Sequence, residues 1–114
     1  MIKELKAVVR TDCVAELVHA LREAGVMRFH VNHVHVLGAG VDPRDYRLSL
    51  DEGEAYMEKA KIEILCPVEK VENVLRLMRE RACTGHRGDG IVVVSEVEEV
   101  LNIRTGDRDA LALL

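Results

Sequence analysis

The residues best suited to binding chemistry are three glycines within residues 84–90, which read Thr-Gly-His-Arg-Gly-Asp-Gly. Glycine lets a backbone approach a ligand closely and adopt positive φ. Successive backbone N–H groups in such a turn can bind an anion. No Gly-Lys-Ser/Thr follows, so the segment is not a P-loop. It is either a phosphate-binding loop or a plain turn between a helix and a strand.

Arg104 is the second candidate, because a guanidinium can hold a phosphate through paired N–H donors. It lies in the stretch Asn102-Ile103-Arg104-Thr105-Gly106, at the end of the last expected strand. Taken alone, this residue is better explained as a solvated side chain.

Histidines and cysteines offer a metal-binding alternative. His33 and His35 would share one face of a strand, with their Cα atoms about 6.5–7 Å apart, and His30 would lie on the other face. Two imidazoles and a third ligand can hold a transition metal, but a polar strand face or a subunit interface is the more common explanation of such a pair. Three cysteines without a CxxC pair predict neither a disulfide framework nor a zinc site. No catalytic triad or carboxylate pair is evident, so an enzyme is not expected.

Composition excludes several classes of protein. The chain has 114 residues, 48% of them hydrophobic and 32% charged, with a net charge of −4. It is therefore expected to be one globular domain, residues 1–114, rather than disordered. A general nucleic-acid binder is not expected, because such a protein would normally show a basic stripe and this chain is acidic overall. No stretch matches a membrane span or a signal peptide, so we expect a cytoplasmic protein, placed at a membrane only through a partner.

The apolar spacing predicts a sequence of elements. Strands are expected at residues 5–10, 28–37, 57–66 and 91–94, with a last short strand within 97–103. One helix should start at Val14 after a Thr11 or Asp12 cap and end at Gly25, and a second should start at Pro67. Residues 38–54 show no sustained period and read as a long, mobile loop.

This order predicts an α+β fold, a ferredoxin-like βαββαβ sandwich. Its antiparallel sheet would carry both helices on one face, with the long loop between strands 2 and 3. Subunit association would cover the other face.

Four segments together resemble the PII signal-transduction proteins over nearly the whole chain. They are the glycine-rich segment, Val97-x-x-Val100-x-x-Ile103-Arg104-Thr105-Gly106, Ala7-Val8-Val9-Arg10 and residues 59–64. The resemblance implies a homotrimer with adenine nucleotide in the clefts between subunits. It implies a T-loop at about 38–57, a B-loop at about 83–90 and a C-terminal loop at about 104–114. The T-loop would bind and regulate a partner protein, such as a transporter or an enzyme.

The resemblance also assigns a nucleotide site. His30 falls where the family lines the adenine pocket. Arg87, His86 or Arg108 could compensate for phosphate-binding cations that this chain lacks, and the sequence does not decide among them. The expected ligand is ADP, AMP or ATP, and no cofactor is required. The full set of expected nucleotide-binding residues is Val8, His30, Val36, Leu37, Gly38, Ala39, Gly40, Glu63, Ile64, Leu65, Thr84, Arg87, Gly88, Asp89, Gly90 and Arg104.

The departures from the family pattern predict an atypical member. Ile91 replaces a phosphate-binding lysine and Asn102 replaces an arginine, which favours ADP or AMP over the more highly charged ATP. Restoring both cations should then raise ATP affinity. Ala39-Gly40 replaces an Arg-Gln pair and Glu52 replaces the uridylylated tyrosine, so 2-oxoglutarate sensing and uridylylation are not expected. The alternative is a metal-responsive or bicarbonate-responsive regulator, linked to metal efflux or carbon uptake.

Overall fold

The computed structural model describes all 114 residues, and an antiparallel sheet forms its centre. The main sheet has the strand order β2-β4-β1-β5, and the short β3 pairs with β4. The strands are β1 (Ile2–Arg10), β2 (His30–Leu37), β3 (Arg47–Ser49), β4 (Glu54–Pro67) and β5 (Gly90–Val97). The helices are α1 (Val14–Glu23) and α2 (Val71–Ala82).

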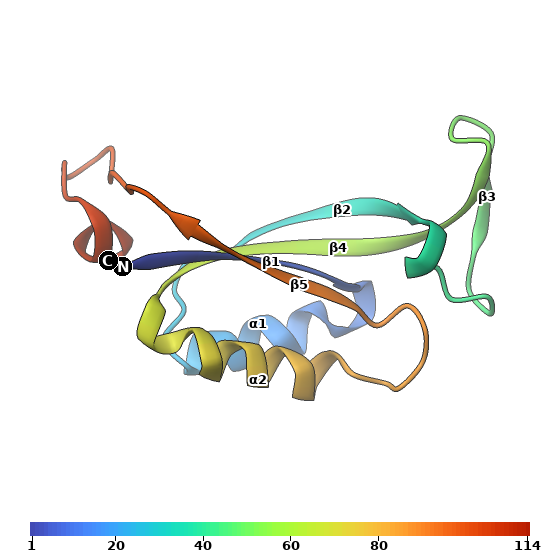
Figure 1. Cartoon of the computed structure of the whole chain (residues 1–114), viewed down its shortest axis with the longest axis horizontal. Helices are drawn as coiled ribbons and strands as arrows, with labels where there is room; N and C mark the ends of the chain where they lie inside the picture. The colour runs from blue at the N-terminus through green and yellow to red at the C-terminus, as the bar shows by residue number, and fades with distance from the viewer.

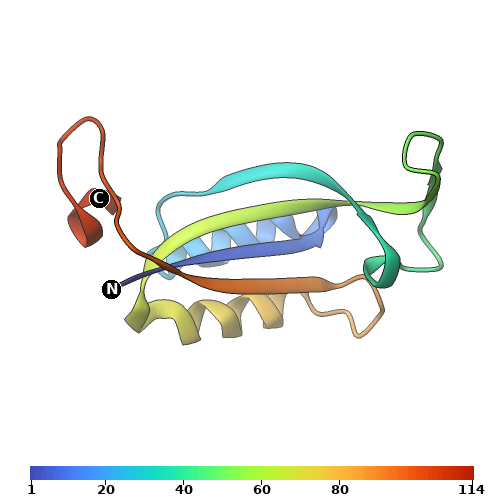
Figure 2. The same cartoon turned by 45° about the horizontal axis from the view of Figure 1, so that its top comes forward.

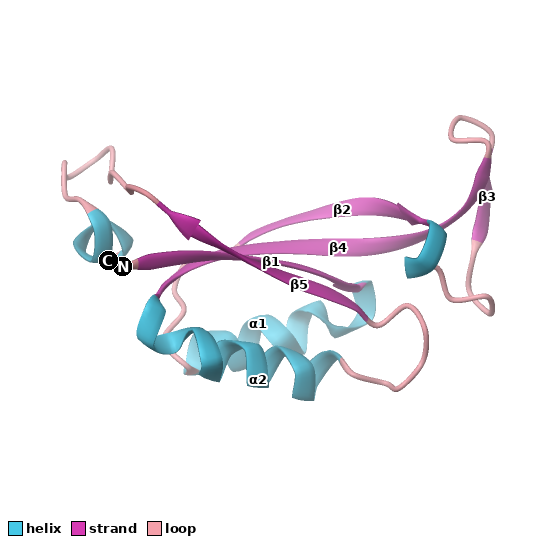
Figure 3. Ribbon diagram, in the orientation of Figure 1, coloured by secondary structure: helices cyan, strands magenta, loops and turns pink.

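Both helices cover the same face of the sheet, as Figures 1 and 3 show. Alternate residues of β1 and β4 point toward them, because side chains alternate across a strand. The sheet side of the core includes Leu5, Ala7, Val9, Ile62 and Ile64, and the helix side includes Leu17, Leu21, Val74 and Met78. The predicted ferredoxin-like arrangement is confirmed.

The opposite face of the sheet is left uncovered by any element of this chain. It carries Val8, Ile91 and Val93 beside charged residues such as Lys61 and Glu63. Ile91 and Val93 are exposed, at 67% and 50% of their surface. Such a mixed face is open to association with another molecule.

The helix starts differ from their prediction. Neither Thr11 nor Asp12 caps a helix with its side chain, because residues Thr11–Cys13 form a 3-10 turn whose backbone bonds lead into α1. A second 3-10 turn, Val68–Lys70, separates Pro67 from α2. The end of α1 is as predicted, since Gly25 follows it with φ +96°.

Three strands are longer than predicted, β2 begins two residues later than predicted, and the last predicted strand was wrong. β1 begins at Ile2 and β4 extends over 14 residues, since pairing with two neighbours satisfies their backbones along the full length. Beyond Val97 there is only an isolated bridge between Leu101 and Arg108. The tail ends in a 3-10 helix, Asp109–Leu113.

The expected mobile loop contains an ordered hairpin. β3 pairs with the first residues of β4, from Arg47 opposite Tyr56 to Ser49 opposite Glu54. The hairpin projects from one end of the sheet, while both termini lie at the other end (Figures 1 and 2). The chain contains no helix that is long and apolar enough to cross a membrane.

Candidate functional site

Two cavities lie at opposite ends of the sheet. The glycine-loop pocket, of about 590 Å³, is lined by Val8, Val36, Leu37, Ala39, Gly40, Lys59, His86, Arg87, Gly88, Asp89, Gly90 and Ile91. The tail pocket, of about 390 Å³, is lined by Glu4, Arg28, His30, Glu63, Ile64, Leu65, residues 100–104, Ala112 and Leu113. The eight residues of β5 run between them and span roughly 26 Å.

The predicted nucleotide-binding residues divide between these two pockets. Val8, Val36, Leu37, Ala39, Gly40, Arg87, Gly88, Asp89 and Gly90 line the glycine-loop pocket. His30, Glu63, Ile64, Leu65 and Arg104 line the tail pocket. Gly38 and Thr84 line neither. One copy of the chain therefore does not bring Arg104 to the glycine loop.

The glycine loop, residues 83–90, is organised by its own Asp89. The Asp89 carboxylate accepts backbone N–H bonds from Thr84 at 2.7 Å and Gly85 at 2.9 Å, and a bond from the Thr84 hydroxyl. Burial alone would raise the pKa of Asp89, but these bonds and one from Arg10 hold it well below its usual range. Part of the predicted anion nest is thus already filled, which leaves the Gly88–Gly90 backbone facing the pocket.

Gly90 forms the tightest backbone contact of the site. Its φ is +109°, and an added Cβ would lie 1.7 Å from the carbonyl oxygen of Val8. The space allows only glycine here. The end of the glycine loop therefore lies directly against β1, on the floor of the pocket.

Lys59 lines the same pocket and was missed by the sequence analysis. Its side chain is buried, with 1% of the residue exposed, and it makes no ion pair in the chain. Its Nζ lies 3.7 Å from the position of a Cβ on Gly40. Burial lowers the pKa of Lys59, and the nearby Arg10 lowers it further. A buried cation without a carboxylate partner favours an anionic ligand.

A sequence signal for Lys59 does exist. Strand alternation places it on the face away from the helices, and in the register it lies opposite Arg10. Two neighbouring cations on one strand pair repel each other unless acidic groups or a ligand offset their charge. That pairing becomes visible only once the register of β1 and β4 is known.

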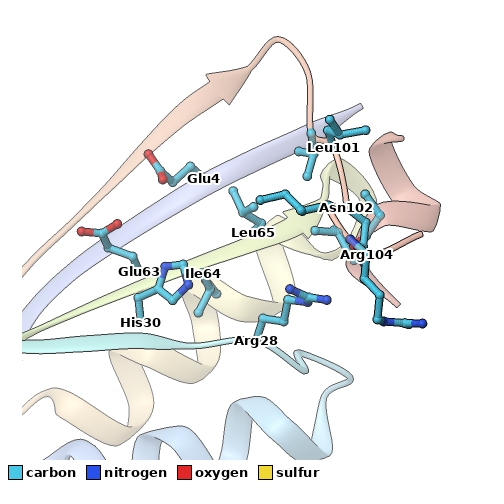
Figure 4. Close-up of a pocket in the computed structure, with 13 residues that line it drawn as sticks. Glu4, Arg28, His30, Glu63, Ile64, Leu65, Leu101, Asn102 and Arg104 are labelled. Carbon is cyan, nitrogen blue, oxygen red and sulfur yellow. The ribbon is translucent and has the colours of Figure 1, made fainter. Parts of the chain in front are cut away.

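The tail pocket combines acidic and basic ends. Figure 4 shows Glu4, Glu63 and His30 on one side of it and Arg28 and Arg104 on the other. Carboxylates accept hydrogen bonds from an exocyclic amine, and guanidinium groups bind phosphate. Arg28, two residues before the start of β2 at His30, is a second residue that the sequence reasoning missed. The pocket is chemically suited to a ligand with a purine and an anionic group.

Asn102 shapes the tail pocket from within its wall. It is 8% exposed, and its Nδ2 donates to the carbonyl oxygen of Ala112 at 3.1 Å. Its Oδ1 accepts the backbone N–H groups of Arg104 at 3.0 Å and Thr105 at 3.2 Å. Asn102 is therefore not a vacated phosphate contact, because its amide holds Arg104 and the last 3-10 helix in place.

The metal alternative gains no support from the histidines. His35 Nδ1 lies 2.6 Å from Glu52 Oε1, and its ring stacks on Tyr56 with centroids 4.0 Å apart. Its hydrogen bond to Glu52 holds the pKa of that carboxyl below its usual value. The chain has no group of three or more His, Cys, Asp or Glu residues arranged to hold a metal. His35 instead joins β2 to the tip of the hairpin.

Known proteins match the chain over nearly its full length. A family model described as "Nitrogen regulatory protein P-II" matches residues 2–107. "Nitrogen regulatory protein P-II 2" of Methanothermobacter thermautotrophicus is 36% identical over 111 residues, covering 92% of this chain and 91% of that protein. The P-II protein of Synechocystis is 30% identical, covering 97% and 99%.

Two solved structures are similar as well. The structure of the B. subtilis GlnK-ATP complex matches with a TM-score of 0.79 at 27% identity, covering 97% of this chain and 94% of that chain. Arabidopsis thaliana PII bound to citrate also matches with a TM-score of 0.79, at 30% identity, covering 97% and 91%. Both descriptions name an anionic ligand bound by those proteins.

Proposed function

Because the chain belongs to the nitrogen regulatory protein P-II family, we propose that it is a signalling protein that binds an adenine nucleotide between copies of itself. Binding regulates a partner protein through the hairpin of the central loop, residues 38–57. The protein acts in the cytoplasm, and at a membrane where its partner is a transporter.

The observation that carries this proposal is the buried, unpaired Lys59 in the glycine-loop pocket. Its ammonium lies near a backbone that exposes Gly88–Gly90 and beside the Arg87 side chain. These groups together provide a phosphate site without any carboxylate other than the already engaged Asp89. The anionic end of a nucleotide fits this pocket.

The two pockets are complementary halves of one site. The glycine-loop pocket supplies cationic and backbone donors, and the tail pocket supplies Glu63 and His30 for a base and Arg28 and Arg104 for phosphates. They lie at opposite ends of one chain, so a neighbouring copy is needed to complete the site. The uncovered sheet face, with Ile91 and Val93 exposed, offers a surface for assembly into a homotrimer.

The choice of nucleotide follows from Ile91. It is 67% exposed at the rim of the glycine-loop pocket, where it offers no charge to a third phosphate. Each missing charge-assisted hydrogen bond costs about 1.5–3 kcal/mol. ADP or AMP therefore binds at least as tightly as ATP.

The projecting hairpin supplies the surface for the partner. Tyr46, Leu48 and Leu50 are exposed, Leu50 completely. They lie between Arg44 and Asp51, so apolar and charged groups alternate along one short segment. A protein surface that offers a shallow apolar site with charged edges fits this hairpin.

Calorimetry with ATP, ADP and AMP, together with light scattering, tests the proposal. We expect the mass of three chains, and ADP or AMP binding with a Kd no weaker than that of ATP. No heat from any nucleotide at millimolar concentration contradicts the nucleotide site. A tenfold or greater preference for ATP contradicts the argument from Ile91, and the mass of a single chain contradicts the shared site.

A matched pair of variants tests the role of Lys59. Lys59→Gln is expected to weaken ADP binding about tenfold or more, because one charge-assisted bond is lost. Lys61→Gln is the control, since Lys61 lies on the same strand and face but pairs with Glu63 at 3.2 Å. Equal effects of the two changes would show that Lys59 has no special role.

A further inference from the structure

Arg10, the last residue of β1, connects the glycine loop to the base of the central loop. Its Nη2 donates to Asp42 Oδ2 at 3.2 Å and to the carbonyl oxygen of Arg87 at 3.0 Å. Its Nε donates to Asp89 Oδ1 at 3.2 Å. The side chain is 14% exposed, so these bonds are largely shielded from water. One guanidinium thus bridges two segments that are distant in sequence.

Asp42 receives this bridge and extends it toward the hairpin. It is 2% exposed, and besides Arg10 it binds Arg44 three times. Its Oδ1 accepts the Arg44 backbone N–H at 2.9 Å and Nε at 3.2 Å, and its Oδ2 accepts Arg44 Nη2 at 2.9 Å. The bonds from Arg44, followed by the bond from Arg10, hold the pKa of Asp42 well below its usual range despite burial. Arg44 lies just before β3.

The two loops also pack without a gap. An added Cβ on Gly88 would lie 3.1 Å from Arg10 Nη2 and 3.1 Å from the Cβ of Asp42. Gly88 lines the glycine-loop pocket, whereas Arg10 and Asp42 lie behind its wall and do not line it. A displacement of the glycine loop therefore acts directly on Asp42.

We propose that Asp42 is the positioning residue through which the β3–β4 hairpin responds to a ligand in the glycine-loop pocket. The inference rests on the proposed function, since it takes the ligand to be a nucleotide. A phosphate bound at Arg87 and Gly88–Gly90 holds the glycine loop in one position. Arg10 then keeps its bonds to Arg87 and Asp89 and presents its Nη2 to Asp42, which in turn holds Arg44 at the base of the hairpin.

The ligand changes the hairpin only because it binds the linked arrangement better than an arrangement in which the link is broken. Such couplings are typically 5- to 150-fold. Nucleotide is therefore expected to slow the opening of the hairpin by about fivefold or more. Asp42 touches no ligand in this scheme, so its loss uncouples the hairpin while binding is retained.

Hydrogen exchange of residues 43–54 in the full-length protein tests the link, with and without saturating ADP. In the unaltered protein ADP slows this exchange by about fivefold or more. In Asp42→Asn, ADP still binds, with a Kd weakened by about the fivefold coupling that is lost, and ADP changes the exchange less than about twofold. Asp51→Asn is the matched control, since it removes the same charge from the same loop and the exposed Asp51 side chain makes no hydrogen bond or ion pair. It should respond as the unaltered protein does.

The outcomes distinguish the role of Asp42 from the proposed nucleotide binding. A full response of the hairpin in Asp42→Asn overturns the role of Asp42 and leaves nucleotide binding intact. Absence of ADP binding to the unaltered protein overturns the proposed function itself, and the inference with it. If circular dichroism shows that Asp42→Asn is unfolded, Arg44→Gln weakens the same link at an exposed side chain, because it removes the two guanidinium bonds and leaves the backbone bond. A response by Arg44→Gln equal to that of the unaltered protein then contradicts the proposal.

Discussion

The two ends of the sheet build their binding surfaces in different ways. At the glycine-loop end, Arg10 and the carboxylates of Asp42 and Asp89 join three segments through charged groups that are shielded from water. At the tail end, one neutral amide, Asn102, holds the chain reversal that carries Arg104. The first arrangement connects its pocket to a distant hairpin, whereas the second fixes a local turn.

The difference predicts how far the effect of a local change spreads. Hydrogen bonds between charged groups that bridge two loops change together when either loop moves. Breaking any one of these bonds leaves a buried charge unpaired. A local turn breaks without affecting the rest of the sheet. We therefore expect changes at the glycine-loop end to alter binding and the hairpin together, and changes at the tail end to remain near the tail.

The largest effect is expected from Gly90→Ala. The new methyl group would meet the Val8 carbonyl oxygen at 1.7 Å, so β1 and β5 must separate. We expect a loss of about 3 kcal/mol or more in the free energy of unfolding, and loss of ADP binding. Denaturant titration and calorimetry measure the two.

Gly106→Ala is the matched change at the tail end. Its φ is +77°, but nothing lies within 4 Å of an added Cβ, so only the backbone strain remains, about 1 kcal/mol. Similar losses from the two variants would contradict the difference between the ends.

Asn102→Ala should have the next largest effect. It removes one bond to Ala112 and two from the backbone of Arg104 and Thr105, at about 0.5–1.5 kcal/mol each. We expect a loss of about 2 kcal/mol in the free energy of unfolding, and faster hydrogen exchange within residues 100–114 while the hairpin is unchanged. Ile103→Ala, at a residue 96% exposed, is the control and should change stability by less than about 0.5 kcal/mol.

Ile91→Lys should raise ATP affinity by about tenfold, which corresponds to about one charge-assisted hydrogen bond. Ile91 is exposed at the rim of the glycine-loop pocket, so the longer side chain needs no repacking. Calorimetry with ATP measures the change. Asn102→Arg, although it also restores a family cation, should not raise ATP affinity, because arginine cannot replace the bonds of the buried amide. A gain in Asn102→Arg would contradict the structural role of Asn102.

Lowering the pH should destabilise the glycine-loop end of the sheet more than the tail end. This is the smallest of the expected effects, because it is absent near neutral pH. The pKa values of Asp42 and Asp89 are lowered in the folded chain, so their contribution is complete above the ordinary carboxyl pKa of about 4 and is lost as pH falls below it. The Asn102 turn does not titrate. Hydrogen exchange is measured at pH 3 and pH 6 and corrected for intrinsic rates. From pH 6 to pH 3 it should accelerate more in residues 84–90 than at residues 104–105. Equal acceleration would contradict this assignment.

The fold could be read from the sequence because its periodicity is strong. Alternation at Leu5, Ala7 and Val9 and helical spacing at Val71, Val74 and Met78 specify the buried faces, and the structure packs them together. Gly25 marked the end of α1 for the same local reason. The hairpin at Arg47–Ser49 could not be read in this way, because β3 is three residues long and most of its surface is exposed. Its strand character comes from pairing with β4.

The candidate site was only partly accessible to sequence reasoning. Residue types and their spacing determined the sheet with two helices and the glycine-rich loop, since these depend on local backbone preferences and burial patterns, and they made Arg104 a candidate phosphate ligand. The tertiary structure alone decided that the site is divided between two ends of the chain, that Lys59 is buried without a partner, and that Asp42 meets Arg10. Those features depend on strand register and on contacts between residues far apart in sequence, and no local pattern records which charged side chain faces which.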